Sequence, residues 1–430
     1  MFKIKEDGAV TEREGHNAIL VGLGTGEDMS RSMEELASLA EAAGLEVLGE
    51  MVQNADKIHA STYIGSGKLE ELAEMCGNMQ AGLVVFNDEL SGMQQRNIEE
   101  VCGVPVIDRT VLILDIFAQR ASSLEGKLQV EMAQLEYRLP RLSGLGKALS
   151  RLGGGIGTRG PGEKKLETDR RHIRRRISAI KKELEEVKAN RSVQRVRREK
   201  SGIPVAALVG YTNSGKSSIM NHLMSMEERD DKMVFEKDML FATLDTAQRL
   251  VTFSDGRSFV LIDTVGFVSK LPTALVDAFK ATLEELEYAD ILIHVVDSSY
   301  EDCGFQMEVT RGLMKELGID EKPVLTAFNK SDLIAPKYKE NLLLLHGRDG
   351  VAISCRTGEG FEEFLKAVKD MLFMDLKVVE LLIPYTRGDV VSALLEGSRA
   401  LQTRYDEDGT YIKAELGEAD RGRFKDYIIN

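Results

Sequence analysis

The sequence predicts an α/β protein of several domains that includes a long antiparallel helical hairpin. Short apolar runs alternate with helical stretches over residues 17–107 and again over residues 205–373, which is typical of sheets built from βαβ units. Between these parts, two segments have apolar residues at heptad spacing, as paired helices do. At about 150 residues per domain, the 430 residues are enough for about three domains.

The first part of the chain predicts a parallel sheet covered by helices. Strands are expected at residues 18–21, 45–53, 83–86 and 104–107, and helices at residues 31–43, 68–79 and 94–101. Residues 22–26 lack the final glycine of a dinucleotide fingerprint and so favour a tight turn. Residues 65–68 lack the first glycine of a phosphate loop and so favour a helix start.

Two long helical segments are expected next, at residues 110–142 and 166–187. In the first, leucines recur every seven residues from Leu128 to Leu142, and Pro140 should bend this helix or mark its last turn. The apolar seam of the second consists of Leu166, Ile173, Ile177, Ile180, Leu184 and Val187. The glycine-rich residues 144–162 would join the two at the tip of a hairpin.

The rest of the chain predicts a second α/β domain and a small α+β tail. The tail has an expected strand at residues 378–383, a helix at 389–397 and a hairpin that turns at 407–409, and it carries no chemical motif. The expected domains are an N-terminal α/β domain (1–108), the helical hairpin (109–201), the second α/β domain (202–373) and the tail (374–430).

Composition excludes several classes of protein. Hydrophobic residues make up 43% and charged residues 29%, so a globular core can form and the chain is not disordered as a whole. No apolar run is long enough for a membrane-spanning helix, and the N-terminus lacks the apolar segment of a signal peptide. The four scattered cysteines predict neither a disulfide framework nor a zinc site. We expect a soluble, monomeric, cytoplasmic protein, with peripheral attachment to a membrane left open.

Charge is distributed unevenly along the chain. The net charge is −14, yet residues 147–200 hold 18 basic and 7 acidic side chains, a local charge of +11. Residues 1–110 hold 20 acidic and 8 basic side chains, a local charge of −12. A basic segment on an acidic protein most often meets phosphate, as in nucleic acid. The alternative is a solvated helix face.

Residues 210–217 match the pattern GxxxxGK[ST], between an expected strand at 205–209 and an expected helix at 218–224. This context is what a phosphate-binding loop requires, because its backbone N–H groups surround the β-phosphate at a helix N-terminus. Lys216 would reach the β- and γ-phosphates, and the Ser217 hydroxyl would bind Mg²⁺. The nucleotide contacts expected here are Gly210, Tyr211, Thr212, Asn213, Ser214, Gly215, Lys216, Ser217 and Ser218.

A second motif, Asp263-Thr264-Val265-Gly266, ends the expected strand at 259–262. Asp263 would hold Mg²⁺ through a water molecule, and the N–H of Gly266 would contact the γ-phosphate. The next residue is Phe267, where many GTPases have a glutamine that orients water. Because phenylalanine cannot do so, we expect slow intrinsic hydrolysis.

Two further motifs predict a guanine pocket. Asn329, Lys330 and Asp332 follow the expected strand at 324–328. The Asp332 carboxylate can accept two hydrogen bonds from guanine that adenine cannot donate, and the Lys330 stem would pack on the base. Backbone contacts would come from Ser354, Cys355 and Arg356. Four motifs in this order at strand ends predict a P-loop GTPase domain.

Beyond these motifs, the chain resembles the HflX-type GTPases over most of its length. The matching stretches are residues 63–68, 87–91, 95–97, 108–110, 117–121, 125–131, 153–163 and 166–171, together with the GTPase motifs. The resemblance implies a ribosome-associated GTPase whose N-terminal domain and hairpin dock on the large subunit, with activity raised by ribosomes and linked to the splitting of stalled ribosomes. The chain departs from the family pattern at Thr246, usually proline, and at Lys164-Lys165, usually Thr-Gln.

The resemblance also assigns switch I to residues 241–245, with Phe241, Ala242 and Thr243 at the nucleotide. Thr243 would contact Mg²⁺ and the γ-phosphate, so the expected catalytic residues are Lys216, Thr243 and Gly266. Asn213 is similar to the asparagine of potassium-activated GTPases and would help to hold K⁺. The alternative is that Asn213 only stabilises the loop.

The basic residues of the hairpin are the expected RNA contacts. They are Arg151, Arg159, Lys164, Lys165, Arg170, Arg171, Arg174, Arg175 and Arg176. The alternative is that they pair with Glu183, Glu185 and Glu186 or face solvent. Two other functions stay open: a GTPase that acts in RNA modification, and a scaffold that binds GTP without using it.

Overall fold

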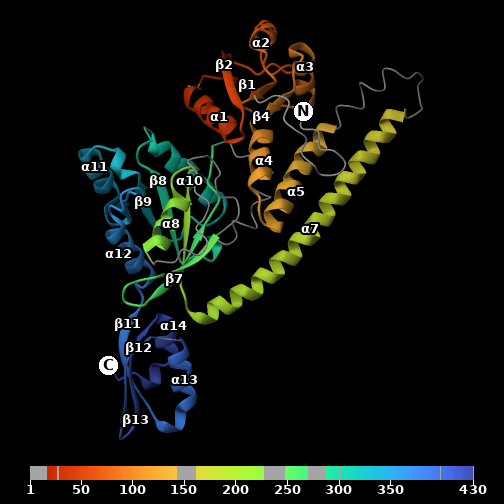
Figure 1. Ribbon diagram of the computed structural model, residues 1–430. Helices are drawn as coiled ribbons and strands as arrows, with labels where there is room; N and C mark the ends of the chain where they lie inside the picture. The colour runs from red at the N-terminus through yellow and green to blue at the C-terminus, as the bar shows by residue number, and fades with distance from the viewer. Residues whose placement is uncertain are drawn as a thin grey trace. The chain divides into compact units, whose positions relative to one another are not determined.

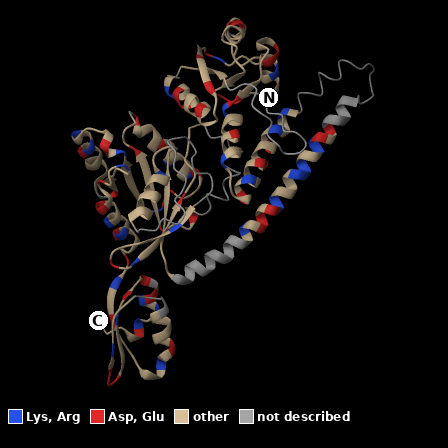
Figure 2. Ribbon diagram, in the orientation of Figure 1, with Lys and Arg blue, Asp and Glu red and all other residues tan. Residues whose placement is uncertain are grey.

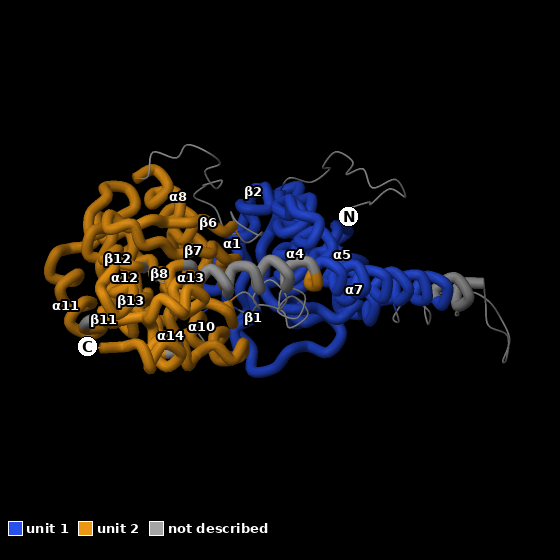
Figure 3. Tube along the Cα trace, turned by 90° about the horizontal axis from the view of Figure 1, so that it is seen from below, with its two compact units in different colours: residues 1–187, 236–245, 268–282 blue, residues 188–235, 246–267, 283–430 orange. Residues whose placement is uncertain are grey.

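The computed structural model describes residues 17–26, 29–142, 161–226, 247–269, 286–300, 302–397 and 399–429 (Figure 1). These residues divide into two compact units (Figure 3). Residues up to 187 belong to the first unit together with residues 268–269, and the other described residues form the second. The predicted fold class is confirmed: a parallel α/β domain with a helical hairpin, a P-loop GTPase domain and a small α+β domain.

The first unit contains a parallel sheet of four strands in the order β2-β1-β3-β4. The strands are β1 (Asn17–Gly24), β2 (Glu46–Asn54), β3 (Leu83–Phe86) and β4 (Val106–Asp108). The helices between them are α1 (Ser30–Ala42), α2 (Ser66–Met79) and α3 (Gly92–Cys102). Ile19, Val84 and Phe86 are fully buried against α2 and α3, and α1 contributes the buried Leu36 and Leu39.

Local signals explain where these elements begin. Ser91 caps α3 in a capping box with Gln94, and the Asp108 carboxylate caps the next helix by accepting from the Val111 N–H at 3.1 Å. Helix α2 begins within the stretch that was expected to start a helix. The expected turn at residues 22–26 is only partly correct, because Gly22 and Gly24 lie in β1 and only Gly26 has a positive φ, +96°.

The helical segment expected at residues 110–142 is two helices, α4 (Arg109–Arg120) and α5 (Leu124–Arg141). The break lies at residues 121–123, where the Ser123 hydroxyl accepts a hydrogen bond from the Gly126 N–H at 2.9 Å and begins α5 anew. The prediction of one continuous helix was therefore wrong. Heptad spacing indicates which face of a helix is apolar, but it does not show where the helix begins. Pro140 lies in the last turn of α5, as expected.

Helix α7 (Pro161–Ser201) returns antiparallel to α5 (Figure 1). Ile177, Ile180 and Leu184 of the predicted seam are buried. Between the helices, Arg176 bonds both carboxylate oxygens of Glu131 at 2.7 Å, and Lys181 pairs with Glu136 at 3.3 Å. The tip, residues 144–160, lies outside the described residues.

The second unit is built on a sheet of six strands in the order β10-β9-β8-β5-β7-β6. The strands are β5 (Val205–Gly210), β6 (Ala247–Thr252), β7 (Ser258–Asp263), β8 (Ile291–Asp297), β9 (Val324–Asn329) and β10 (Gly350–Ala352). Only β6 is antiparallel within this sheet, and it lies at the edge. The helices are α8 (Lys216–Met226), α10 (Cys303–Glu316), α11 (Pro336–His346) and α12 (Phe361–Leu372).

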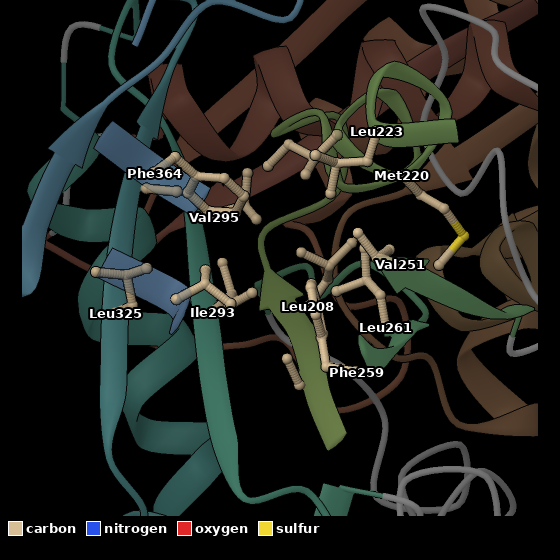
Figure 4. Packing of buried hydrophobic residues seen from close by; sticks show 14 of the residues in the cluster. Leu208, Met220, Leu223, Val251, Phe259, Leu261, Ile293, Val295, Leu325 and Phe364 are labelled. Carbon is tan, nitrogen blue, oxygen red and sulfur yellow. The ribbon is translucent and has the colours of Figure 1, made fainter. Parts of the chain in front are cut away.

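The hydrophobic core of this domain packs the strands of the six-stranded sheet against helices α8 and α12. Figure 4 shows Leu208 and Leu261 from the strands lying near Met220 and Leu223 of α8. Val295 and Phe364 of α12 meet on the same side of the sheet (Figure 4). Burying a large aliphatic or aromatic side chain contributes about 1.5–3 kcal/mol. This packing holds the carboxyl ends of the parallel strands at one edge.

The C-terminal domain is an antiparallel sheet with helices, as expected. Its elements are β11 (Lys377–Ile383), α13 (Gly388–Gly397), β12 (Arg399–Asp406), β13 (Gly409–Leu416) and α14 (Glu418–Arg423), with strand order β11-β13-β12. The four cysteines are free thiols. Within the part of the chain that the structure describes, no helix is long and apolar enough to cross a membrane.

Candidate nucleotide-binding site

The four predicted motifs lie at the carboxyl ends of β5, β7, β9 and β10. Because these strands are parallel, their ends share one edge of the sheet. In open α/β sheets this edge is where ligands bind. The fold therefore brings together motifs that are more than one hundred residues apart in the sequence.

Glycine is required at both ends of the loop after β5. A Cβ on Gly210 would lie 2.2 Å from the Val295 carbonyl oxygen, and one on Gly215 would lie 2.0 Å from Nδ2 of Asn329. Gly210 has a φ of +152° and Gly215 a φ of +96°. Asn213, between them, has a φ of +59°, a left-handed conformation that asparagine tolerates better than most residues. This conformation gives Asn213 a role in the loop backbone whether or not it also binds a cation.

Lys216 is buried at the base of the loop. Its ammonium donates to the carbonyl oxygens of Gly210 at 3.1 Å and Tyr211 at 2.7 Å. Burial lowers the pKa of Lys216 to about 8, and the Asp263 carboxylate opposes that shift. A buried ammonium whose close partners are carbonyl dipoles favours the approach of an anion, as expected of a phosphate-binding lysine.

Ser217 and Asp263 lie together, although 46 residues separate them. The Ser217 hydroxyl donates to Oδ2 of Asp263 at 2.7 Å, and Asp263 is fully buried at the end of β7. A hydroxyl oxygen and a carboxylate oxygen are the ligand types that Mg²⁺ prefers. These two residues therefore fit the expected magnesium site.

The segment after β7 is bonded directly to the loop. The Thr212 N–H donates to the Phe267 carbonyl oxygen at 2.7 Å, and the Phe267 N–H donates to the Gly210 carbonyl oxygen at 3.1 Å. A Cβ on Gly266 would lie 2.6 Å from Cα of Thr212 and 3.0 Å from Nζ of Lys216, so only glycine fits there. The Phe267 side chain is buried.

Asn329 joins the other motifs to the loop. Its Nδ2 donates to the Ser214 carbonyl oxygen at 2.9 Å, and its Oδ1 accepts from the Cys355 N–H at 3.3 Å. The Ser354 hydroxyl donates to Oδ1 of Asp332 at 2.7 Å. Asn329 thus connects the phosphate loop to the loop after β10. The hydrogen bond from Ser354 orients the Asp332 carboxylate, which was expected to select guanine.

Sequence reasoning missed one partner in this pocket, Asp297. Its carboxylate ends β8 and pairs with the Lys330 ammonium at 2.6 Å. Since the Lys330 stem was expected to cover the base, Asp297 would hold that stem in place. The signal available in the sequence was an acidic residue at the end of a strand that is apolar except for His294, on the same sheet edge.

Several expected residues cannot be placed. Phe241, Ala242 and Thr243 lie outside the described residues, and so do Arg151 and Arg159. Lys164 and Lys165 belong to α7, but only their backbone is described.

Two sets of basic residues can be distinguished on the described part of α7, and the half-buried Arg170 belongs to neither. Arg171, Arg174, Arg175 and Lys182 line an open groove on the exposed side of the helix, with Ser178 and Ala179 between them. Arg176 instead pairs with Glu131 and, at 3.1 Å, with Glu183, which raises its pKa. Figure 2 shows the basic positions of α7, and the sequence places acidic residues before Arg170 and after Lys182 but none between them. The alternative of internal pairing therefore describes Arg176 in this structure, and its role in RNA binding stays a prediction.

Three family models match consecutive parts of the chain. They are described as GTP-binding GTPase N-terminal (residues 30–118), GTP-binding GTPase Middle Region (120–198) and 50S ribosome-binding GTPase (205–330). The chain is also 46% identical over 418 residues to the GTPase HflX of Caldanaerobacter subterraneus subsp. tengcongensis, covering 97% of this chain and 95% of that protein. It is 38% identical over 400 residues to the GTPase HflX of Escherichia coli K12, covering 92% of each.

Proposed function

Because the chain belongs to the HflX family of GTPases, we propose that it is a cytoplasmic factor that binds the large ribosomal subunit and dissociates stalled ribosomes. It binds and hydrolyses GTP, as the family and the P-loop domain establish. The observation that carries the ribosomal role is the exposed basic groove of α7. The rest of the chain outside residues 147–200 has a net charge of −25 and would be repelled by RNA. The match to the 50S ribosome-binding model supports the same partner.

The proposed chemistry follows from the loop and the segment after β7. Lys216 releases the loop carbonyls and bonds the β- and γ-phosphates, while the Gly266 N–H, with Thr243 of switch I, contacts the γ-phosphate. Mg²⁺, held by Ser217, Thr243 and, through water, Asp263, would neutralise charge on the phosphate oxygens. Phe267 offers no group that could orient water, so the intrinsic rate is low. A group supplied by the ribosome or by the rest of the chain raises it.

The base is selected by Asp332, which accepts hydrogen bonds from guanine while Lys330 covers its face. Ser354, Cys355 and Arg356 complete the pocket through their backbone. In the loop, the Asn213 amide oxygen would help to hold K⁺, and a cation there would stabilise charge that develops during transfer.

The proposed RNA surface consists of the groove residues and the basic residues near the tip. Arg171, Arg174, Arg175 and Lys182 line the groove, and the half-buried Arg170 directly precedes them in α7. Arg151, Arg159, Lys164, Lys165 and Arg170 would extend the same charge toward the glycine-rich tip, where small residues let RNA approach closely. Binding at this surface is tested by whether isolated large subunits raise the rate of GTP turnover, whereas small subunits do not.

A further inference from the structure

The loop that follows β10 is closed by backbone hydrogen bonds between its two ends. The Ser354 N–H donates to the Glu359 carbonyl oxygen at 3.0 Å, and the Gly358 N–H donates to the Ser354 carbonyl oxygen at 2.8 Å. Neither of these bonds involves Cys355 or Arg356, which lie between the bonded ends. The peptide group that joins these two residues is therefore positioned by other contacts.

His222 of α8 contacts this peptide group. The His222 ring forms a hydrogen bond with the backbone of Cys355. Burial lowers the pKa of the His222 imidazole, and this hydrogen bond opposes the shift. A backbone partner that raises the pKa of a histidine is an acceptor, so a ring N–H donates to the Cys355 carbonyl oxygen.

Packing holds the His222 ring in the position that this bond requires. The ring lies over Phe361, the first residue of α12, with 4.0 Å between the ring centroids and 34° between the ring planes. Phe361 is itself buried in the core of the domain. On the other side, a Cβ on Gly358 would lie 3.4 Å from Cε1 of His222, so the imidazole lies close to the loop backbone.

Filling this space does not by itself require a histidine. A half-buried imidazole costs free energy unless its N–H is hydrogen-bonded, and a leucine would fill the space without that cost. The bond to Cys355 has a geometric consequence as well. Because the trans peptide group is planar, the Cys355 carbonyl and the Arg356 N–H lie in one plane and point in opposite directions. The bond from His222 therefore sets the direction of the Arg356 N–H.

The Arg356 N–H is available to a ligand. Among the residues that the structure describes, it has no acceptor within the protein. The edge of guanine carries donors at N1 and N2, which Asp332 is expected to bind, and one acceptor, O6. The Ser354 hydroxyl bonds the Asp332 carboxylate at 2.7 Å, so this loop lies directly beside it. A backbone donor in this loop is suited to bind O6.

We propose that His222 is a positioning residue for guanine recognition, which orients the peptide between Cys355 and Arg356 so that the Arg356 N–H donates to O6 of the base. His222 acts through this peptide and does not touch the nucleotide. It lies on the same helix as Lys216, so α8 positions groups for the phosphates and for the base. The inference rests on the proposed guanine pocket and adds the residue that determines how O6 is recognised.

The test compares the affinities of the full chain for GDP and two analogues. In 6-thioguanosine diphosphate a weakly accepting sulfur replaces O6, and inosine diphosphate lacks the N2 amine. His222→Leu has a similar volume and removes the ring donor. Its preference for GDP over the thio analogue should fall about three-fold or more, as expected for one neutral hydrogen bond. Its preference for GDP over inosine diphosphate should stay unchanged, because Asp332 binds the amine.

Two further variants serve as controls. His222→Gln, whose amide can donate to the same carbonyl, should keep most of the preference for GDP over the thio analogue. Lys339→Met removes an ion pair with Glu359 at the other end of the loop, and its preferences should equal those of the unaltered chain.

Two results for His222→Leu would overturn the proposal: an unchanged preference for GDP over the thio analogue, or a loss of affinity for all three nucleotides by the same factor. The second result would give His222 a role in packing alone. If the unaltered chain preferred GDP to neither analogue, the guanine pocket itself would be wrong, and the proposed role of His222 would fail with it.

Discussion

We expect the base preference of the site to depend on one carboxylate, that of Asp332. Ser354 holds one of its oxygens, so the side chain is oriented before a base arrives. Asp332→Asn keeps an acceptor for Ser354 but replaces the other acceptor with a donor. The loss of a charged hydrogen bond costs about 1.5–3 kcal/mol, so GTP turnover at low substrate should fall about ten-fold or more, and xanthosine triphosphate should compete better. Full retention of GTP preference in a competition assay would contradict the assignment of the pocket.

Asn213 allows a test of the monovalent cation. Turnover measured in K⁺ should exceed that measured in Na⁺, and Asn213→Ala should remove the difference. Asn213→Gly is the matched control for the backbone, because glycine accepts the φ of +59° without the amide. Equal rates of the unaltered chain in both salts would leave Asn213 with its backbone role alone.

His294 in β8 makes stability depend on pH. Burial, together with the positive charges of Arg311, Lys216 and His346, lowers its pKa to about 3. Because the unfolded chain takes up a proton near pH 6.5 and the folded chain does not, this contribution to stability is complete above pH 6.5 and is lost as the pH falls toward 3. Its slope is at most about 1.4 kcal/mol per pH unit.

The variant His294→Gln lacks this titration. Calorimetry between pH 6.5 and 5 should show a steeper fall in the unfolding temperature of the unaltered chain than of the variant, whatever their absolute difference. This interval is chosen because most carboxylates stay ionised there. Parallel slopes would show that His294 is not held neutral in the folded protein.

At the scale of elements, helix α7 carries one arginine with a partner on α5, Arg176, and others that we propose to bind RNA. Replacing Arg171, Arg174, Arg175 and Lys182 by alanine should weaken binding of the GTP-loaded protein to large subunits. It should also make the plot of log binding constant against log salt concentration less steep. The slope should fall by about 1 for each phosphate that the protein no longer neutralises. Arg176→Ala is the contrasting variant: it breaks the pair with Glu131 and should lower the stability of the hairpin while leaving the salt slope unchanged. Unchanged affinity and slope in the fourfold variant would move the docking surface elsewhere, with residues 60–120 as the next candidate.

The elements also show which features the sequence could predict. The phosphate loop was predictable because its glycine spacing and its flanking strand and helix are local signals, and the structure places them as expected. The break at Ser123 was missed because the heptad leucines begin only at Leu128, so their spacing carries no information about the residues before them. A run of basic residues likewise could not show that Arg176 has a partner on α5.

At the scale of the whole molecule, the unpredicted features are contacts between distant segments. Asn329 bonds the Ser214 carbonyl 115 residues away, and Arg109 bonds Ser269 at a separation of 160 residues. No local sequence pattern identifies such pairs. Each residue could have many different neighbours, and its partner is decided only when the strands of its sheet are assembled. The strand-end motifs nevertheless predicted which edge of the second sheet would carry the site.

The central claim, a GTPase whose work is directed at the large ribosomal subunit, is tested most directly by turnover. GTP hydrolysis by the full chain should be slow alone, faster with isolated large subunits and unchanged with small subunits. Lys216→Ala, which removes the ammonium that bonds the phosphates, should stay at background in every mixture. A rate that large subunits do not raise, from a protein that still binds GTP, would contradict the claim.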